Sequence, residues 1–197
     1  MSLLPILMAI RVRGRTTLAV VACATGLPEA DARTRLVDAA AAGFVHGVDG
    51  DILLSAAGRA ELATLLARES NDRAALATLY DEFLATDSRL KTCITAWQLA
   101  AAPPRAMAEA RTAAQLPAAA TLGELRAVAA EARAFVERLA AIVARLAPYA
   151  QRLGAAADAL ARGDTRFAAS PRVDSLHQVW FELHEDLLVT LGRERAA

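Results

Sequence analysis

Apolar residues recur at intervals of three and four along most of the chain, which is the spacing of one face of an α-helix. In the first third, this spacing predicts helices over residues 1–10, 17–24 and 29–42. Glycines, which favour helix ends, follow the second and third of these helices, and a proline precedes the third. The chain is therefore expected to begin with short helices separated by tight turns.

The pattern changes to that of a β-hairpin before Ser55. Residues 44–46 and 51–54 could form the two strands around a tight turn at 48–50. Ser55 is placed to cap a further helix. Helix, turn, helix, hairpin and helix is the element order of a winged helix-turn-helix domain, which we expect over residues 1–69.

Residues 70–197 have helical spacing throughout and predict a bundle of antiparallel helices, because short loops join the elements. Residues 105–120 are ambiguous, with a short helix possible over 107–114, and Pro148 is expected to end a helix. The four longer helices are expected at 71–101, 122–147, 149–162 and 172–191. The predicted fold is mainly α: an N-terminal winged helix-turn-helix with a small β-hairpin, followed by an antiparallel helical bundle.

The first third of the chain resembles the MarR-like winged-helix regulators of bacteria. The matching segments are Ala22-x-x-Thr25-Gly26-Leu27-Pro28-Glu29, Ala42-Gly43-Phe44-Val45 and Leu54-Ser55-x-x-Gly58-Arg59. In that family the second helix of the pair enters the major groove, and the tip of the hairpin touches the DNA backbone or the minor groove. The resemblance implies that Arg33, Thr34 and Arg35 face DNA. It brings no chemistry for the C-terminal part, whose end is similar only to uncharacterised winged-helix proteins.

The charge balance is unusual for a DNA-binding surface. The chain has 22 basic and 22 acidic residues, and Asp49 and Asp51 lie at the tip of the expected hairpin. Affinity for DNA comes largely from lysine and arginine placed against phosphates. Arg13 and Arg15, just before the helix pair, could reach a backbone. The sequence leaves both weak, dimer-dependent DNA binding and loss of DNA binding open.

Composition excludes several other classes. Cys23 and Cys93 lie in separate apolar helical patterns without metal or disulfide spacing, so we expect both to be small buried residues. Residues 1–10 lack the features of a leader peptide, and no apolar run is long enough to span a bilayer. We therefore expect a cytoplasmic protein with no membrane partner. No phosphate-binding loop or nucleophile motif is present, and neither a cofactor nor a metal is expected.

The last expected helix carries two of the three histidines. At 100° per residue, His177 and His184 fall near the middle of its apolar arc, beside Trp180 and Phe181. Both histidines are expected to point inward and to be neutral, because burial disfavours the imidazolium. The polar side expected to face solvent comprises Asp174, Gln178, Glu182 and Glu185.

Asp87 falls inside the apolar stripe of the helix over 71–101. A carboxylate there needs a hydrogen-bonded partner, and our hypothesis is that it meets His177 or His184. Such a pair could be a structural tie, part of a ligand pocket, or an acid/base site. In an acid/base site a histidine would transfer the proton and Asp87 would orient that histidine. The candidate ligand-binding residues are Tyr80, Asp87, Trp97, His177, Trp180, Phe181 and His184.

The leading functional expectation is a ligand-responsive transcriptional regulator. It would bind DNA as a homodimer, and a hydrophobic effector with one or two polar groups would bind the helical domain. The alternative is a winged-helix scaffold that has left DNA and acts as a small-molecule-binding protein or a cofactor-independent enzyme. A protein–protein adaptor is the third possibility. An enzyme is the less favoured interpretation, because no nucleophile motif is present.

Overall fold

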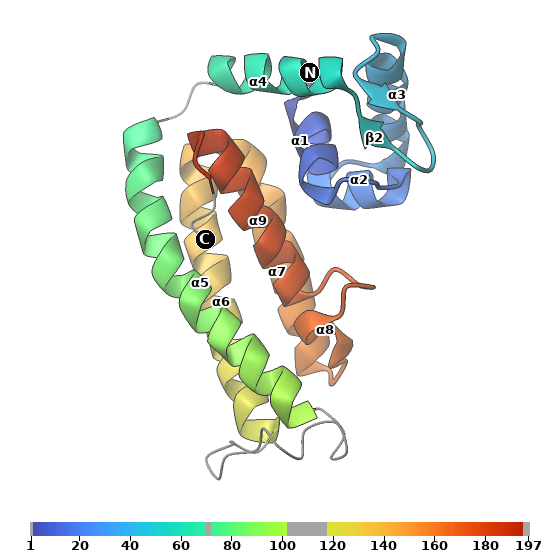
Figure 1. The fold of residues 1–197 in the computed structure, drawn as a ribbon. Helices are drawn as coiled ribbons and strands as arrows, with labels where there is room; N and C mark the ends of the chain where they lie inside the picture. Colours follow the sequence, from blue (N-terminus) through green and yellow to red (C-terminus); the bar gives the residue numbers. More distant parts are fainter. Residues whose placement is uncertain (1, 70–71, 102–117, 195–197) are drawn as a thin grey trace. The chain divides into compact units, whose positions relative to one another are not determined.

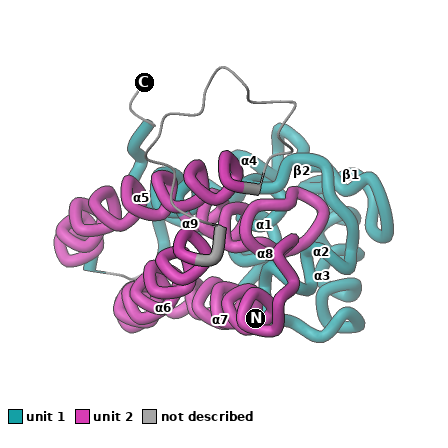
Figure 2. Tube along the Cα trace, turned by 90° about the horizontal axis from the view of Figure 1, so that it is seen from below, with its two compact units in different colours: residues 1–72, 184–197 teal, residues 73–183 magenta. Residues whose placement is uncertain are grey.

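The computed structural model describes residues 2–69, 72–101 and 118–194. The protein is mainly helical, with a small two-stranded antiparallel sheet (Figure 1). It divides into two compact units: residues 1–72 together with 184–197, and residues 73–183 (Figure 2). The final helix begins in the second unit and ends in the first. Residues 184–197, which the sequence assigns to the helical bundle, group with the first 72 residues.

Among its described residues, the first unit contains four complete helices, the hairpin and the end of the final helix. Strand β1 (Val45–His46) pairs antiparallel with β2 (Leu53–Leu54), with Val45 opposite Leu54. Thr16, before the second helix, pairs with Ile52 through two backbone hydrogen bonds of 2.9 and 3.1 Å. The helices are α1 (Leu4–Arg13), α2 (Leu18–Thr25), α3 (Glu29–Ala41) and α4 (Ala56–Arg68).

Local sequence accounts for where these elements begin and end. Gly26 ends α2 in the left-handed region at φ 68°, a conformation that glycine adopts without a Cβ penalty. Pro28 precedes α3, where its fixed φ suits a helix start. The Ser55 hydroxyl accepts a hydrogen bond from the Gly58 N–H at 2.9 Å, so it caps α4 as expected.

Gly58 also allows α4 to approach the end of α3 closely. A Cβ at this position would lie 2.0 Å from the carbonyl oxygen of Phe44, and that oxygen accepts a hydrogen bond from the Ser55 N–H at 2.9 Å. No side chain fits at such a distance. A glycine is therefore required where α4 passes Phe44, between α3 and β1.

Helix α1 lies at the centre of the first unit. Ile6, Leu7 and Ile10 are fully buried, and they share a hydrophobic core with Leu36 of α3 and Ile52 before β2. Val189, near the C-terminal end of the last helix, packs against this core. Burial on nearly all sides of α1 explains its weak amphipathic pattern, because a helix surrounded by neighbours has no solvent face to keep polar.

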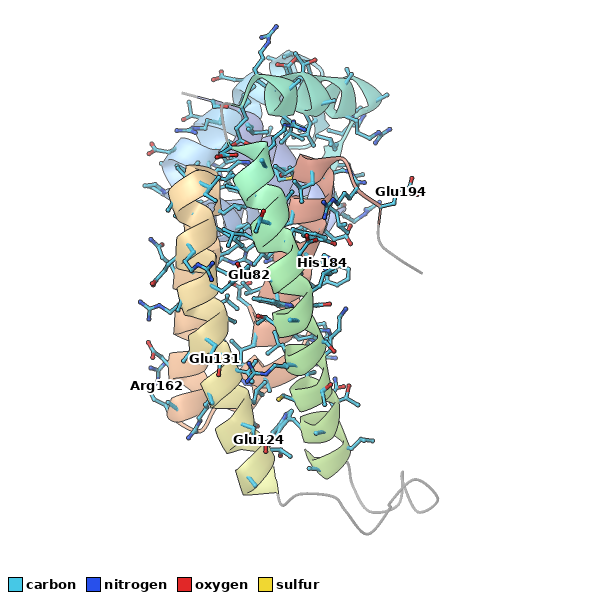
Figure 3. All side chains as sticks on the ribbon, turned by 90° about the vertical axis from the view of Figure 1, so that its left-hand side faces the viewer. Glu82, Glu124, Glu131, Arg162, His184 and Glu194 are labelled. Atoms are coloured by element: carbon cyan, nitrogen blue, oxygen red, sulfur yellow. The ribbon has the colours of Figure 1, made fainter. Side chains whose placement is uncertain are left out.

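The second unit is built from long antiparallel helices. Two ion pairs join the first two helices of this unit, Glu82 with Arg138 and Arg89 with Glu131. Residue numbers rise along one helix as they fall along the other, so the two helices are antiparallel (Figure 3). The elements are α5 (Arg73–Ala101), α6 (Ala118–Ile142), a 3-10 turn (Ala144–Leu146), α7 (Ala147–Ala161), α8 (Arg166–Ala169) and α9 (Leu176–Leu191).

Three expectations for this unit need correction. Helix α6 ends at Ile142, and Pro148 lies in the first turn of α7 rather than at the end of a helix. The first turn needs no N–H donor from that residue, so proline is tolerated there. Residues 166–169, expected in a loop, form α8, and the last helix begins at Leu176 instead of 172. The possible helix over 107–114 lies outside the described residues.

The cysteine expectation is wrong in part. Cys23 is exposed and Cys93 is half-buried, and neither forms a disulfide within the described residues. Within the described ranges, no helix combines the length and the apolar character needed to cross a bilayer.

Candidate functional site

Helix α3 presents a polar face beside the hairpin. Ala32, Leu36 and Ala39 are fully buried in the first unit's core, so the intervening positions point outward. Arg33 and Thr34 are exposed, and the Thr34 hydroxyl donates to the Ala30 carbonyl oxygen at 3.0 Å. This is the face that sequence reasoning assigned to DNA.

Arg33 of that face and Arg15, which precedes α2, form ion pairs with the hairpin turn. The Arg33 guanidinium contacts the Asp49 carboxylate, and Nη1 of Arg15 lies 2.9 Å from Oδ1 of Asp51. The side chains of both pairs are about half to three quarters exposed. The structure therefore brings the candidate DNA-binding arginines Arg15 and Arg33 together with the two acids of the turn.

The other candidate positions are less open. Nη1 of Arg35 donates to the Ser2 carbonyl oxygen at 3.4 Å, and Arg35 is only half-exposed. Arg13, in the last turn of α1, is also half-buried. Arg15, Arg33 and Thr34 are thus the exposed members of the five predicted DNA-binding residues.

Asp87 is buried in the second unit, as its place in the apolar stripe predicts. Its Oδ1 accepts a hydrogen bond from the indole N–H of Trp180 at 3.0 Å, and its Oδ2 lies 2.7 Å from Nζ of Lys91. Sequence reasoning gave the partner role to a histidine and treated Trp180 as a flanking residue. These contacts to Trp180 and Lys91 satisfy both carboxylate oxygens.

Aromatic packing surrounds this contact. The Trp180 ring stacks on Phe83 with centroids 4.6 Å apart, and Phe83 stacks on Tyr80 at 5.8 Å. Trp180 and Phe83 are almost fully buried. Rings stacked at this distance fill the space between α5 and α9. The candidate pocket residues Tyr80, Asp87 and Trp180 are therefore part of a packed interior.

The histidines occupy different environments. His177, in the first turn of α9, is exposed, which corrects its expected inward position. Its pKa is lowered from the ordinary value, first by partial burial and then by the charge of Lys91. His184 is buried and belongs to the other compact unit. Phe181, expected in the apolar arc, is also exposed at 41%, and Trp97 is half-buried.

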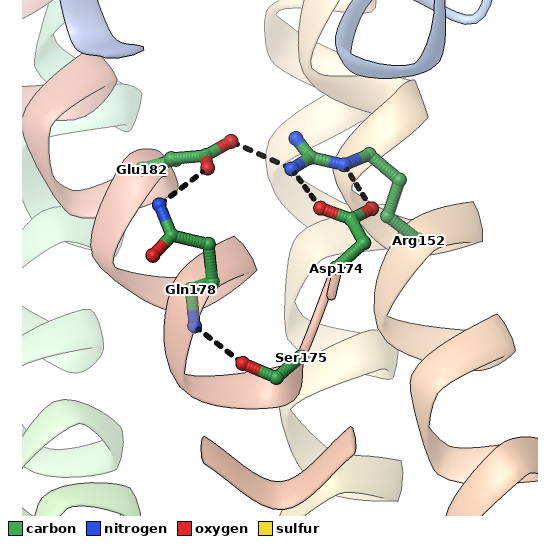
Figure 4. A network of polar contacts seen from close by, with 5 residues as sticks. All are labelled: Arg152, Asp174, Ser175, Gln178 and Glu182. Atoms are coloured by element: carbon green, nitrogen blue, oxygen red, sulfur yellow. Dashed lines mark hydrogen bonds and ion pairs between the residues drawn. The ribbon is translucent and has the colours of Figure 1, made fainter. Parts of the chain in front are cut away.

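The main polar cluster of the second unit was missed by sequence reasoning. Arg152 of α7 forms a bidentate ion pair with Asp174 at 2.6 and 2.8 Å, and its Nη2 also donates to Glu182 of α9 at 2.6 Å (Figure 4). The Gln178 amide donates to Oε1 of Glu182 at 2.8 Å. Glu182 is 1% exposed, so its expected solvent position is wrong.

The electrostatics of this cluster favour a fixed structural role. Burial of Arg152 opposes its charged form, but hydrogen bonding to Asp174 and the charge of Glu182 outweigh that cost and raise its pKa above the ordinary value. The guanidinium therefore stays charged and ties α7 to α9. The usable signal was the position of Arg152 among Tyr149, Leu153 and Ala156 on the apolar side of α7, where a cation requires a carboxylate partner.

A hollow of about 410 Å³ lies between α5 and α6, away from the predicted pocket. Burial raises the pKa of the Cys93 thiol in its wall, and the charge of Glu124 adds to this effect. The Arg89–Glu131 ion pair lies next to the hollow. The lining residues are Ser88, Arg89, Thr92, Cys93, Glu124, Ala127 and Val128.

Among the residues that the structure describes, no group of three histidine, cysteine or acidic side chains could hold a metal ion. Comparison with family models, curated proteins and solved structures found no match for this chain. What the geometry offers is therefore an exposed polar helix face beside a hairpin in one unit, and fixed ion pairs with an open hollow in the other.

Proposed function

We propose that this chain is a DNA-binding transcriptional regulator whose first unit acts as a winged helix-turn-helix. The observation that carries the proposal is the exposed face of α3, with Arg33 and Thr34, next to the turn between β1 and β2. Helices α2 and α3 are joined by a short turn through Gly26 and Pro28. An exposed helix after such a turn is the part of a helix-turn-helix that enters the major groove.

The chemistry of this face fits backbone positioning better than extensive base reading. Arg33 and Arg15 supply charged, multi-donor groups of the kind that bind phosphate oxygens. Thr34 adds a hydroxyl on the same helix. Because one such face offers few cations, we propose that the regulator binds as a homodimer, which doubles the number of phosphate contacts.

The second unit would carry the effector response and dimerisation. Asp87 and Trp180 are hydrogen-bonded to each other in a packed interior. This contact supports a structural role for residues that the sequence offered as candidates for a ligand pocket. The hollow between α5 and α6 is the better place for an effector, because Cys93 and Val128 give it apolar walls and Ser88 and Thr92 supply hydroxyls. We propose no catalytic role for His177, His184 or Asp87.

The second candidate function is a docking module that has left DNA. The observation in its favour is that Arg15 and Arg33 are already paired with Asp51 and Asp49. A face whose cations are neutralised by its own acids suits a protein partner with mixed charges. The two functions predict opposite results with nucleic acid.

Binding of the full chain to random-sequence duplex DNA, followed by fluorescence anisotropy, tests the proposal. At about 50 mM salt we expect measurable binding that weakens steeply as salt rises, because counterions are released from each contacted phosphate. An acid-neutralised variant of the hairpin turn should be measured beside the wild-type chain. Absence of binding by both at low salt would favour the docking module.

A further inference from the structure

The hairpin turn carries two acids, and each of them forms an ion pair with an arginine. Asp49 pairs with Arg33 of α3, and Asp51 pairs with Arg15, which precedes α2. The two arginines come from different elements, and each meets a different carboxylate. A carboxylate and a phosphate are the same kind of partner for a guanidinium, since both accept paired charge-assisted hydrogen bonds.

The turn is held in place by its backbone. The Leu18 N–H donates to the Asp49 carbonyl oxygen at 3.1 Å, and Ile52 pairs with Thr16. Gly47 has φ 79°, and a Cβ there would lie 2.8 Å from the Gly50 carbonyl oxygen, so the turn is tightly closed. The acids therefore meet the arginines from a defined support rather than from a free loop.

We propose that Asp49 and Asp51 form an autoinhibitory contact that occupies Arg33 and Arg15 in place of DNA phosphates. This inference rests on the proposed DNA-binding function and names its regulation. To bind DNA, each phosphate must displace one carboxylate, and the displaced carboxylate then repels the backbone. The contact lowers the affinity of the protein for any duplex. Tight binding then requires a DNA site or a state of the protein that supplies additional contacts.

The expected size of the effect follows from exposure. Both pairs are solvent-exposed, and such pairs change an equilibrium by about fivefold at most for each pair. Release of both arginines should therefore tighten DNA binding by roughly tenfold at low salt. Higher salt should shrink the difference, because exposed charges are screened.

The test variant is Asp49→Asn/Asp51→Asn in the full chain. Asparagine tolerates the left-handed conformation of Asp51, whose φ is 50°, so the turn is retained. The matched control is Asp31→Asn/Asp38→Asn, which removes two exposed acids from α3 itself. Both variants change the net charge equally, so a difference between them reports the ion pairs rather than overall charge.

We expect the turn variant to bind random duplex DNA about tenfold tighter than wild type, and at least threefold tighter than the control variant. Detectable binding by the turn variant, with none by wild type or by the control variant, would also support the inference. Equal tightening in both variants, or weaker binding by the turn variant, would overturn the inference while the DNA-binding function stands. Absence of binding by all three proteins would overturn the inference and the proposed function together.

Discussion

The indole N–H of Trp180 donates a hydrogen bond to Oδ1 of Asp87 at 3.0 Å, across 93 residues of chain. Lys91 holds the second carboxylate oxygen at 2.7 Å from the neighbouring turn of the same helix. A buried carboxylate with both oxygens engaged is stable in place and joins α5 to α9. This relationship explains how an aspartate can lie in an apolar stripe, because both of its carboxylate oxygens have partners.

Asp87→Ala should destabilise the fold by about 1–3 kcal/mol, because the buried Trp180 N–H loses its acceptor. Asp87→Asn keeps an acceptor oxygen for Trp180 and should cost less. Lys91→Met should cost about 1 kcal/mol or less, since Lys91 is largely exposed. Urea unfolding of the three variants checks the order. A loss for Asp87→Ala no larger than that for Lys91→Met would contradict the structural role.

The ion cluster of Arg152 should respond more strongly. Arg152→Met leaves Asp174 and the buried Glu182 without their cation, and removal of one partner from a buried ion pair costs about 3–5 kcal/mol.

The double variant Arg152→Met/Glu182→Leu supplies the control for this cluster. With the buried carboxylate replaced by an apolar side chain, it should recover much of the lost stability, because burial of an uncompensated charge is the dominant cost. Denaturant unfolding of both variants measures the two effects. A penalty for Arg152→Met no larger than that of an exposed ion pair, about 1 kcal/mol or less, would show that the cluster does not hold α7 to α9.

His177 gives a specific pH dependence. Its pKa in the folded chain lies below the ordinary value of 6.5, so the unfolded chain binds the proton more readily. The stability it contributes is thus present above pH 6.5 and is lost as pH falls from 6.5 through the folded pKa. His177→Gln should remove this part of the pH profile. NMR titration of the ring checks the cause: Lys91→Met should raise the pKa, and titration at or above 6.5 in wild type would contradict it.

Gly58 and Gly123 form a matched pair for testing the packing of the first unit. A Cβ at Gly58 would clash with the Phe44 carbonyl oxygen, whereas a Cβ at Gly123 meets nothing within 4 Å. Gly58→Ala should destabilise by about 1–3 kcal/mol or more through forced displacement. Gly123→Ala, inside α6, should stabilise by about 0.5–1 kcal/mol. Thermal unfolding of both variants tests this, and equal effects would be inconsistent with the close approach at Gly58.

The short elements of the first unit could be predicted from sequence because local chemistry determines their ends. Gly26, Gly43 and Ser55 each fix a helix boundary through backbone conformation or a capping hydrogen bond. The expectation for Pro148 was wrong because a proline can either follow the end of one helix or begin the next. Only the end of α6 at Ile142 shows that Pro148 belongs to the start of α7. Local signals thus locate elements better than they assign a proline to one side of a junction.

The partners of the polar side chains could not be predicted in the same way. Asp87 and Trp180 were both identified as interior residues, but their hydrogen bond depends on the register between α5 and α9. Glu182 lies on the polar side of α9 when that helix is considered alone, and it is buried because α7 brings Arg152 against it. The sequence of a single helix determines neither its register against another helix nor which helix packs against it.

The salt dependence of DNA binding by Arg15→Gln/Arg33→Gln tests the central claim most directly. The matched control is Arg162→Gln/Arg172→Gln, which removes two exposed arginines from the second unit. If α3 and its flanking arginine contact phosphates, the slope of log affinity against log salt should fall by about one for each lost contact, and only in the first variant. Equal slopes for wild type and both variants would contradict the assignment of this face to DNA.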